Sequence, residues 1–287
     1  MSKYNFKFGD VWLSEFGGVC TEVPPIEIAN KDVTLIDIPN KDGSDCIDNG
    51  RYCNVEFTRT VALVGNRIST VQEKAKNLIK HFAYLQGYQD FEDTDHEGMV
   101  TQAVLINLDE VTKNLRTMFT AVLKFSRKPY WKLKSSLSEE KLDSTLLADK
   151  GVVLNNPFPS SACPIIRYYF TTDPHSTMAT TKVNFSFTSN GETITYSKPG
   201  INFKPTHNIL DIDIEEQRAV VHSPGGEIYK YVDVPIPEPI SKGTTIFKAV
   251  LSKETERVSI FPNWRCLYWH LGYIQKLFHH LLIQTTF

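Results

Sequence analysis

Short segments in which apolar and polar residues alternate recur through the second half of the chain, and this pattern constrains the fold more than any other feature. Turn sequences separate them, such as Ser-Asn-Gly-Glu at 189–192 and Ser-Pro-Gly-Gly at 223–226. The alternating segments are 183–188, 193–196, 209–214, 229–234, 244–251 and 257–261. Alternation with a period of two is typical of strands that bury one face. Short strands separated by turns predict an antiparallel β-sandwich, which we place at 151–265.

The first half of the chain has strand-like segments too. Residues 4–8 and 33–38 alternate, and the β-branched run at 55–64 (VEFTRTVALV) indicates a longer strand. Two turn sequences lie between them, Asn-Lys-Asp-Gly at 40–43 and Asp-Asn-Gly at 48–50. The Asn-Gly pair in the second favours the tight turns of β-hairpins. We therefore predict a half-buried strand at 33–38 and a turn at each of the two places.

One internal segment has the apolar spacing of an amphipathic helix. Ser69 can cap it and Gly87 marks its end, so the helix is expected at about 69–86. Lysines lie between the apolar positions, which predicts a helix laid on a sheet with its other face in solvent. The residues expected at helical spacing are Val71, Ala75, Leu78, Ile79 and Phe82. The fold class predicted for the whole chain is mainly β with one packed α-helix.

The length of 287 residues corresponds to roughly two domains at about 150 residues each, and each would be large enough to bury its own core. A polar stretch at 136–150 (SLSEEKLDSTLLADK) is the best candidate for the link between them. We therefore expect an N-terminal domain at 1–135, a linker at 136–150 and the sandwich at 151–265.

Composition and charge exclude several classes of protein. Lys and Arg number 31 and Asp and Glu 33, a net charge of −2, whereas a nucleic-acid binder needs a basic surface to displace counterions. The hydrophobic content of 41% fits a folded protein in water, and no membrane association is expected. The first residues lack the apolar stretch of a secretory signal, so we expect synthesis in the cytoplasm without export by that route. The five cysteines lack metal-ligand spacing and are expected to be free thiols.

The chain carries none of the common catalytic or phosphate-binding motifs, so we expect no enzyme activity, no metal and no cofactor. The acidic segment at 90–97 fails the EF-hand pattern because its sixth and twelfth positions hold Asp95 and Thr101. Asp211 and Asp213 share a strand face, an arrangement that a glycosidase could use. The more ordinary interpretation is the wetted face of a half-buried strand. The sequence therefore favours a structural or binding protein.

Several motifs occur in a fixed order along the chain. They are IPNKDG at 38–43, IDNGRYCNV at 47–55, LKFSRKP at 123–129, ILDID at 209–213 and SIFPNWR at 259–265. Together they resemble the distal tail proteins of long-tailed, non-contractile bacteriophages, also described as the siphovirus tail component family. The resemblance covers residues 4–265.

The resemblance implies an N-terminal ring-forming domain followed by a galectin-like β-sandwich. In such proteins six copies usually form a ring at the tail tip. This homo-hexamer joins the tail tube protein to the tail-tip or baseplate proteins and to a receptor-binding protein. It leaves a central channel through which DNA passes without specific binding. The expected location is the virion, with no membrane contact, and the near-neutral charge suits a conduit better than a DNA-binding surface.

Two surfaces are candidates for binding. The first is the turn-rich stretch at 39–54, which we expect to make ring contacts through Asp42, Gly43, Asp48, Asn49, Gly50, Arg51 and Tyr52. The second belongs to an alternative function, a carbohydrate-binding adhesion module that attaches the tail tip to host cell-wall glycans. Exposed aromatic rings stack on sugars in such modules, and Tyr229 and Tyr231 are the candidates. Alternating tyrosines in a strand are also common in ordinary cross-strand packing.

The sequence departs from the family pattern at its end, because the family usually stops soon after the position of Arg265. Residues 266–287 form an atypical extension whose apolar residues fall at heptad spacing and predict a helical stripe. Those residues are Leu267, Leu271, Ile274, Phe278 and Leu281. Three interpretations stay open: a helix that docks on a neighbouring protein, a tail packed on its own sandwich, or the product of a reading-frame change.

Overall fold

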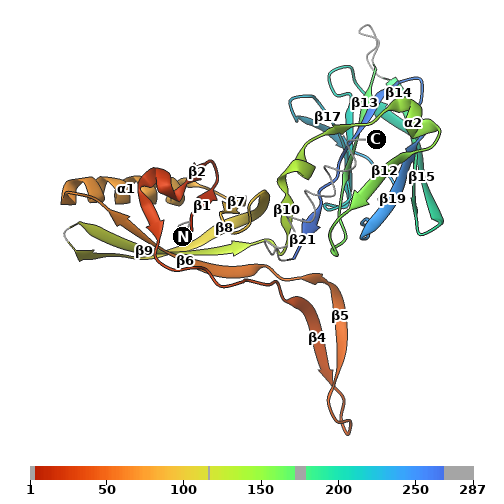
Figure 1. Ribbon diagram of the computed structural model, residues 1–287. Coiled ribbons are helices and arrows are strands. Elements are labelled where there is room, and N and C mark those ends of the chain that lie inside the picture. Colours follow the sequence, from red (N-terminus) through yellow and green to blue (C-terminus); the bar gives the residue numbers. More distant parts are fainter. Residues whose placement is uncertain (1–3, 116, 172–178, 268–287) are drawn as a thin grey trace, which may run out of the picture. The chain divides into compact units, whose positions relative to one another are not determined.

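The structure is a computed structural model that describes residues 4–115, 117–171 and 179–267, with the backbone alone for 109–115. The chain forms two compact units, the first reaching to Trp131 and the second comprising Lys132–Cys266 (Figure 1). Strands dominate both units, which confirms the mainly β fold. The helix predicted in the C-terminal extension falls on residues 268–287 and lies outside the described part of the chain.

The first unit is built on an antiparallel sheet whose main path has the order β2-β1-β7-β8-β9-β6-β3. The strands are β1 (Phe6–Phe8), β2 (Val11–Trp12), β3 (Gly18–Cys20), β6 (Val55–Val64), β7 (Gln89–Asp93), β8 (Met99–Leu115) and β9 (Met118–Arg127), and a short 3-10 helix, η1 (Leu13–Phe16), follows β2. Alternate residues of β6 and β9 are buried, as Phe57 and Phe125 illustrate. Their rings stack with centroids 5.2 Å apart, so the alternation seen in the sequence builds one aromatic core face.

Helix α1 (Ile68–Tyr84) packs against β6 and β9 of this sheet (Figure 1). The buried residues on its inner side are Val71, Ala75, Leu78 and Phe82, which confirms the predicted face except at Ile79, which is only half-buried. Phe82 stacks on Phe8 with ring centroids 5.5 Å apart. The prediction of Ser69 as N-cap was wrong: the Val71 amide bonds back to the Arg67 carbonyl at 3.2 Å, so the helix begins at Ile68 and Ser69 already lies in its first turn.

Strands β4 (Lys31–Asp37) and β5 (Ser44–Tyr52) form a separate two-stranded antiparallel sheet. Figure 1 shows this hairpin, residues 31–52, extending away from the main sheet of the first unit, and we call it the arm. The sequence predicted a half-buried strand at 33–38, but no layer of the described first unit covers either face of the arm. The residues of this strand are therefore largely exposed.

The second unit is a sandwich of two antiparallel sheets with the orders β11-β20-β13-β16-β17-β18 and β12-β19-β14-β15. The first sheet contains β11 (Glu140–Lys141), β13 (Ile165–Phe170), β16 (Ile209–Asp213), β17 (Arg218–His222), β18 (Ile228–Tyr231) and β20 (Thr255–Phe261). The second contains β12 (Val152–Asn156), β14 (Ala179–Ser189), β15 (Glu192–Phe203) and β19 (Gly243–Ala249). Buried side chains from both sheets, such as Tyr168, Leu210, Phe185 and Phe247, form one core. This arrangement confirms the predicted antiparallel sandwich.

The second unit begins and ends in short elements. Strand β10 (Trp131–Leu133) leads into the unit and is followed by the 3-10 helix η2 (Lys134–Leu137). The Leu133 amide donates to the Trp264 carbonyl at 2.9 Å, just before β21 (Arg265–Cys266). The start and the end of this unit therefore lie side by side.

The polar stretch at 136–150, predicted to be a linker, is instead part of the second unit. It contains β11, which pairs with β20, and helix α2 (Ser144–Ala148), whose first amides are capped by the Asp143 carboxylate. The side chain of Leu147 is fully buried in the sandwich core. A few apolar residues are thus enough to pack the segment at 136–150 into the second unit. The average composition of the segment does not reveal them.

Candidate assembly surface

The arm exposes apolar side chains on both of its faces. Leu35 is 64% exposed and lies opposite Cys46, while Ile47 lies opposite Thr34 on the other face. The exposed large apolar residues on β4, β5 and their connection are Val33, Leu35, Ile36, Ile38 and Ile47. Because a two-stranded hairpin is marginally stable alone in water, the arm has the composition of a surface that another molecule covers.

Polar contacts along the arm hold its base in register. The Lys31 ammonium lies 2.8 Å from the Asp48 carboxylate, and Arg51 and Asn49 both donate to Asp32. The hydrogen bond from Arg51 lowers the pKa of Asp32, and the one from Lys31 lowers the pKa of Asp48. These charges are exposed, so each pair stabilises the arm only weakly, and their main effect is to fix the side-chain positions.

The two predicted turns have different outcomes. The turn at 40–43 is confirmed: it joins β4 to β5, with Asn40 and Gly43 at φ of 65° and 78°. The turn at 48–50 was wrong, because these residues lie within β5. The pairing shifts register between Lys31 and Val33, and Gly50, with φ of 72°, takes the left-handed conformation that a bulge needs. The Asn-Gly pair therefore makes a bulge rather than a hairpin turn.

All seven predicted ring-contact residues lie on the arm. Asp42 and Gly43 are at its tip, and the others, from Asp48 to Tyr52, lie on β5 toward its base. The rings of Tyr52 and Tyr130 form a T-shaped pair with centroids 5.9 Å apart, which places Tyr52 against the body of the first unit. Sequence reasoning missed the exposed apolar residues of the arm, because a strand with alternating residues is normally read as half-buried.

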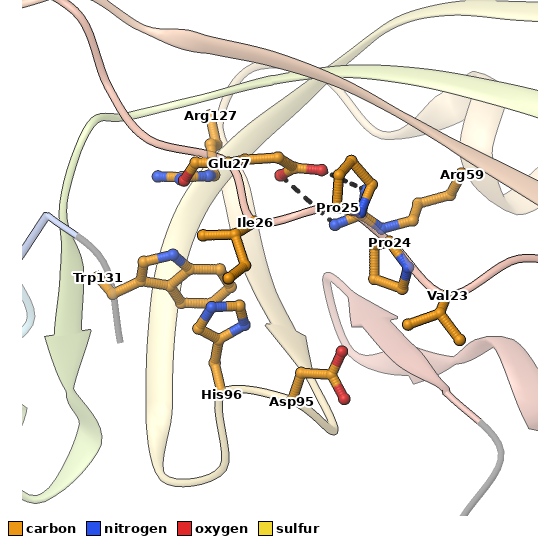
Figure 2. A pocket seen from close by; sticks show the side chains of 10 residues that line it. All are labelled: Val23, Pro24, Pro25, Ile26, Glu27, Arg59, Asp95, His96, Arg127 and Trp131. Carbon is orange, nitrogen blue, oxygen red and sulfur yellow. Dashed lines mark hydrogen bonds and ion pairs between the residues drawn. The ribbon is translucent and has the colours of Figure 1, made fainter. Parts of the chain in front are cut away.

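A segment of extended chain, residues 21–30, connects β3 to the arm, and we call it the strap. It lies over a cavity of about 330 Å³ in the first unit (Figure 2). Residues 23–27 of the strap line one side, and Arg59, Arg127, Asp95, His96 and Trp131 line the rest.

A buried polar network lies beside this cavity. The Arg59 Nε donates to the Tyr4 hydroxyl at 2.9 Å, and that hydroxyl donates to the Asp93 carboxylate at 3.0 Å. Nδ1 of His96 lies 2.7 Å from the same carboxylate, and the His96 ring stacks on Trp131 with centroids 4.1 Å apart. Burial raises the pKa of the Tyr4 hydroxyl far above its usual range, so Tyr4 stays a hydrogen-bond donor.

The cavity is not arranged as an anion site. The guanidinium groups of Arg59 and Arg127 donate to acceptors of the protein itself, chiefly Glu27 and nearby carbonyls. Asp95 also faces the cavity (Figure 2), and burial raises the pKa of its carboxyl. The arrangement therefore suits holding the strap in place better than binding a negatively charged ligand.

The two tyrosines considered for sugar binding lie on β18, at the edge of the six-stranded sheet. Tyr231 is 63% exposed. Tyr229 is half-buried, with the Lys204 ammonium 4.4 Å from its ring centroid and the His207 ring at 5.6 Å. Side chains of the chain itself therefore occupy space around Tyr229, and Tyr231 is the more accessible of the two.

The carboxylates of Asp211 and Asp213 hold local structure. Asp211 forms two hydrogen bonds with Arg167, each 2.6 Å long. Asp213 accepts hydrogen bonds from the amides of Glu215 and Glu216 in the turn after β16. Each carboxylate is thus directed at its own neighbours rather than at a shared site between the two.

Among the described residues, no three His, Cys, Asp or Glu side chains are grouped so that they could hold a metal ion. Among those same residues, no helix combines the length and the apolar character needed to cross a membrane.

No protein-family model matches the sequence, and no curated protein matches it either. The structure is similar to the crystal structure of SPP1 Dit, described as a paradigm of the hub adsorption apparatus in phages that infect Gram-positive bacteria. The TM-score is 0.61 at 12% identity, covering 90% of this chain and 96% of that one. A chain of the phage P2 baseplate in its activated conformation with Ca matches with a TM-score of 0.50 at 7% identity and the same coverage, 90% and 96%. At these identities the similarity establishes a shared fold: nearly the whole chain has the β-rich fold of the SPP1 Dit hub protein.

Proposed function

We propose that this protein is a structural component of a bacteriophage tail, a hub at the tail tip or baseplate, and that it assembles into a ring through its arm. The proposal assigns no reaction and no cofactor to the chain. It places the protein in the virion, after synthesis in the cytoplasm of the host bacterium.

The observation that carries the proposal is the arm with apolar residues on both faces. A ring repeats a contact between two different surfaces of the same chain, so each copy must offer one surface and receive another. The arm is a surface to offer, because Leu35 and Ile47 lie on opposite faces and both are exposed. The hub fold shared with SPP1 Dit supports the same conclusion, since that protein belongs to an adsorption apparatus.

The finer features of the proposal follow the family that the sequence resembles. Six copies would form the ring, with the tail tube protein on one side and tail-tip and receptor-binding proteins on the other. DNA would pass through the central channel without being bound. The seven arm residues predicted as ring contacts, from Asp42 to Tyr52, stay proposed contacts, and the apolar residues of β4 and β5 join them.

The test compares two variants of the full chain by mass photometry and sedimentation. Leu35→Glu puts a charge on the arm, and we expect it to raise the concentration needed for assembly at least tenfold, or about 1.4 kcal/mol. Val153→Glu is the matched control, because Val153 is 62% exposed on β12 of the second unit, nearly as much as Leu35 at 64%. A wild-type chain that stays monomeric at high concentration, or equal assembly of the two variants, would contradict the proposal.

The alternative, a carbohydrate-binding adhesion module, draws support from the exposure of Tyr231 alone. Binding of the full chain to cell-wall polysaccharides, lost in Tyr231→Ala and kept in Tyr84→Ala, would favour it. Tyr84 is an equally suitable control because it is also an exposed tyrosine, at the end of α1. Absence of binding across such polysaccharides would leave the structural role alone.

A further inference from the structure

Apolar packing holds the strap that leads into the arm at one described residue only, Ala29, which is 5% exposed. Val23 is 83% exposed and Ile26 is 74% exposed, and a cavity lies beneath them. Backbone hydrogen bonds fasten the strap at its ends, from the Thr21 amide to the Thr60 carbonyl and from the Cys53 amide to the Asn30 carbonyl. Within the described chain, residues 22–29 form no backbone-to-backbone hydrogen bond. The middle of the strap therefore depends on side chains for its position.

One residue of the strap, Glu27, is held by two arginines from the main sheet: Arg59 binds its carboxylate and Arg127 binds its backbone carbonyl. The Arg59 Nη1 donates to the Glu27 Oε1 at 2.6 Å, and the Arg127 Nη2 donates to the Glu27 carbonyl at 2.8 Å. Figure 2 shows Glu27 between the two guanidinium groups. Arg59 is 4% exposed and Glu27 is 13% exposed, so water screens this ion pair little.

The two arginines are themselves fixed. Arg59 is bound to Tyr4 and to the Thr58 carbonyl, and Arg127 to the carbonyls of Lys128 and Pro129. Charge-assisted hydrogen bonds from rigid donors restrict the acceptor's position more than exposed surface pairs do. The pair of arginines thus forms a rigid clamp on a segment that has little else to hold it.

We infer that Glu27 is the positioning residue of the arm: clamped by Arg59 and Arg127, it fixes the strap and thereby the direction in which β4 leaves the first unit. The strap continues directly into β4 at Lys31. Between Glu27 and β4, the described strap has one backbone hydrogen bond, from the Cys53 amide to the Asn30 carbonyl. An arm with a fixed direction loses less conformational entropy when it meets another copy, and assembly is correspondingly tighter. This inference rests on the proposed role of the arm in assembly.

Hydrogen–deuterium exchange of the full chain, measured at a concentration where it is monomeric, tests the clamp without reference to assembly. Glu27→Gln keeps the shape of the side chain and removes its charge. We expect exchange at the Cys53 amide and in the base of the arm to become about ten- to a hundredfold faster. Glu22→Gln is the matched control, because Glu22 is an exposed carboxylate of the same strap and should leave exchange as in the wild type.

Assembly of the same proteins is then measured by mass photometry. We expect Glu27→Gln to need about tenfold more protein to assemble, measured at a temperature at which both proteins are folded. Its melting temperature should be lower than that of the wild type, because the buried Arg59 loses its charged acceptor. If Glu27→Gln does not fold, Glu27→Asp replaces it, because Asp keeps the charge but shortens the reach and should give an intermediate rate of exchange.

The outcomes of these experiments distinguish the clamp at Glu27 from the proposed role of the arm in assembly. Equal exchange in Glu27→Gln and Glu22→Gln would overturn the clamp. Faster exchange with unchanged assembly would overturn the role of Glu27 in positioning the arm. A wild-type chain that never assembles would overturn the proposed function, whereas faster exchange in Glu27→Gln would still support the clamp.

Discussion

The guanidinium of Arg167 binds the carboxylate of Asp211 through two parallel hydrogen bonds, Nε to Oδ1 and Nη2 to Oδ2, each 2.6 Å long. The two residues are direct partners on the neighbouring strands β13 and β16. Arg167 also lies over the ring of Phe261, 4.7 Å from its centroid. The pair with Asp211 raises the pKa of Arg167 still further, so the guanidinium is charged at every pH at which the protein folds.

Asp211→Asn should therefore destabilise the second unit. We expect the free energy of unfolding to fall by about 2 kcal/mol, because a partly buried arginine loses its charged acceptor. Urea denaturation of the full chain measures the change. Asp233→Asn is the control, since the Asp233 carboxylate is fully exposed beside Lys198, and its effect should stay within about 0.5 kcal/mol. Equal losses in the two variants would show that the pair with Arg167 contributes nothing specific.

Phe82→Ala should destabilise the first unit by about 3–5 kcal/mol, because the truncation leaves a cavity between α1 and the sheet. Phe82 is buried and stacks on Phe8, whereas Tyr84, two residues later on the same helix, is exposed. Tyr84→Ala should cost less than about 0.5 kcal/mol. Thermal and denaturant unfolding of the two variants give the comparison. A small effect of Phe82→Ala would mean that α1 is not packed on the sheet as described.

Alkylation of the native protein should distinguish its thiols. Cys46 and Cys53 are exposed on the arm and at its base, so iodoacetamide should modify them first. Burial raises the pKa of Cys20 to about 12, which leaves almost no thiolate at neutral pH, and Cys163 and Cys266 are buried. Peptide mass spectrometry follows each site. Assembly should also slow the reaction of Cys46, because it lies opposite Leu35 on the arm. Equal rates for Cys46 in dilute and assembled samples would argue against the arm as the contact.

The Asp95 carboxyl should make the first unit slightly less stable as pH rises. Burial raises its pKa in the folded state, while in the unfolded chain it loses its proton near pH 4. Between those two values the folded state holds more protons than the unfolded state, so stability falls as pH rises through that range and is constant above it. Asp95→Asn should remove this contribution and raise the melting temperature at pH 7. A lower melting temperature for Asp95→Asn at pH 7 would contradict the assigned direction.

Local pattern was enough to predict much of the fold. The sandwich strands, such as 209–214, and the buried side of α1 follow from periods of two and 3.6, which each segment carries within itself. The predictions of a cap at Ser69 and of a turn at 48–50 were wrong. Helix α1 already begins at Ile68, and pairing with β4 makes the Asn-Gly pair of β5 a bulge rather than a turn. The prediction of a linker at 136–150 was wrong, because the side chain of Leu147 is buried in the sandwich core and holds this segment in the second unit, although its average composition is polar.

The site was harder to predict than the fold. The contact between Tyr4 and Asp93 joins residues 89 positions apart, and Arg127 reaches Glu27 across 100 positions. No short-range pattern indicates such partners. The exposure of the arm escaped prediction for a related reason: alternation in β4 shows that a face is apolar, but only the packed structure shows whether anything covers it.

The charged residues of the arm affect how readily the unassembled chain aggregates. Among the described residues β4 and β5 pair only with each other, so their outer edges present open backbone groups next to exposed apolar side chains. Strands of this kind recruit further strands and aggregate unless something holds them apart. Asp32, Asp37, Asp42, Asp45 and Asp48 all lie on the arm, where Lys31, Lys41 and Arg51 are the basic residues. Five acidic and three basic residues leave the arm with a net charge of −2, so newly made copies repel one another at the arm, and salt would weaken this protection against aggregation.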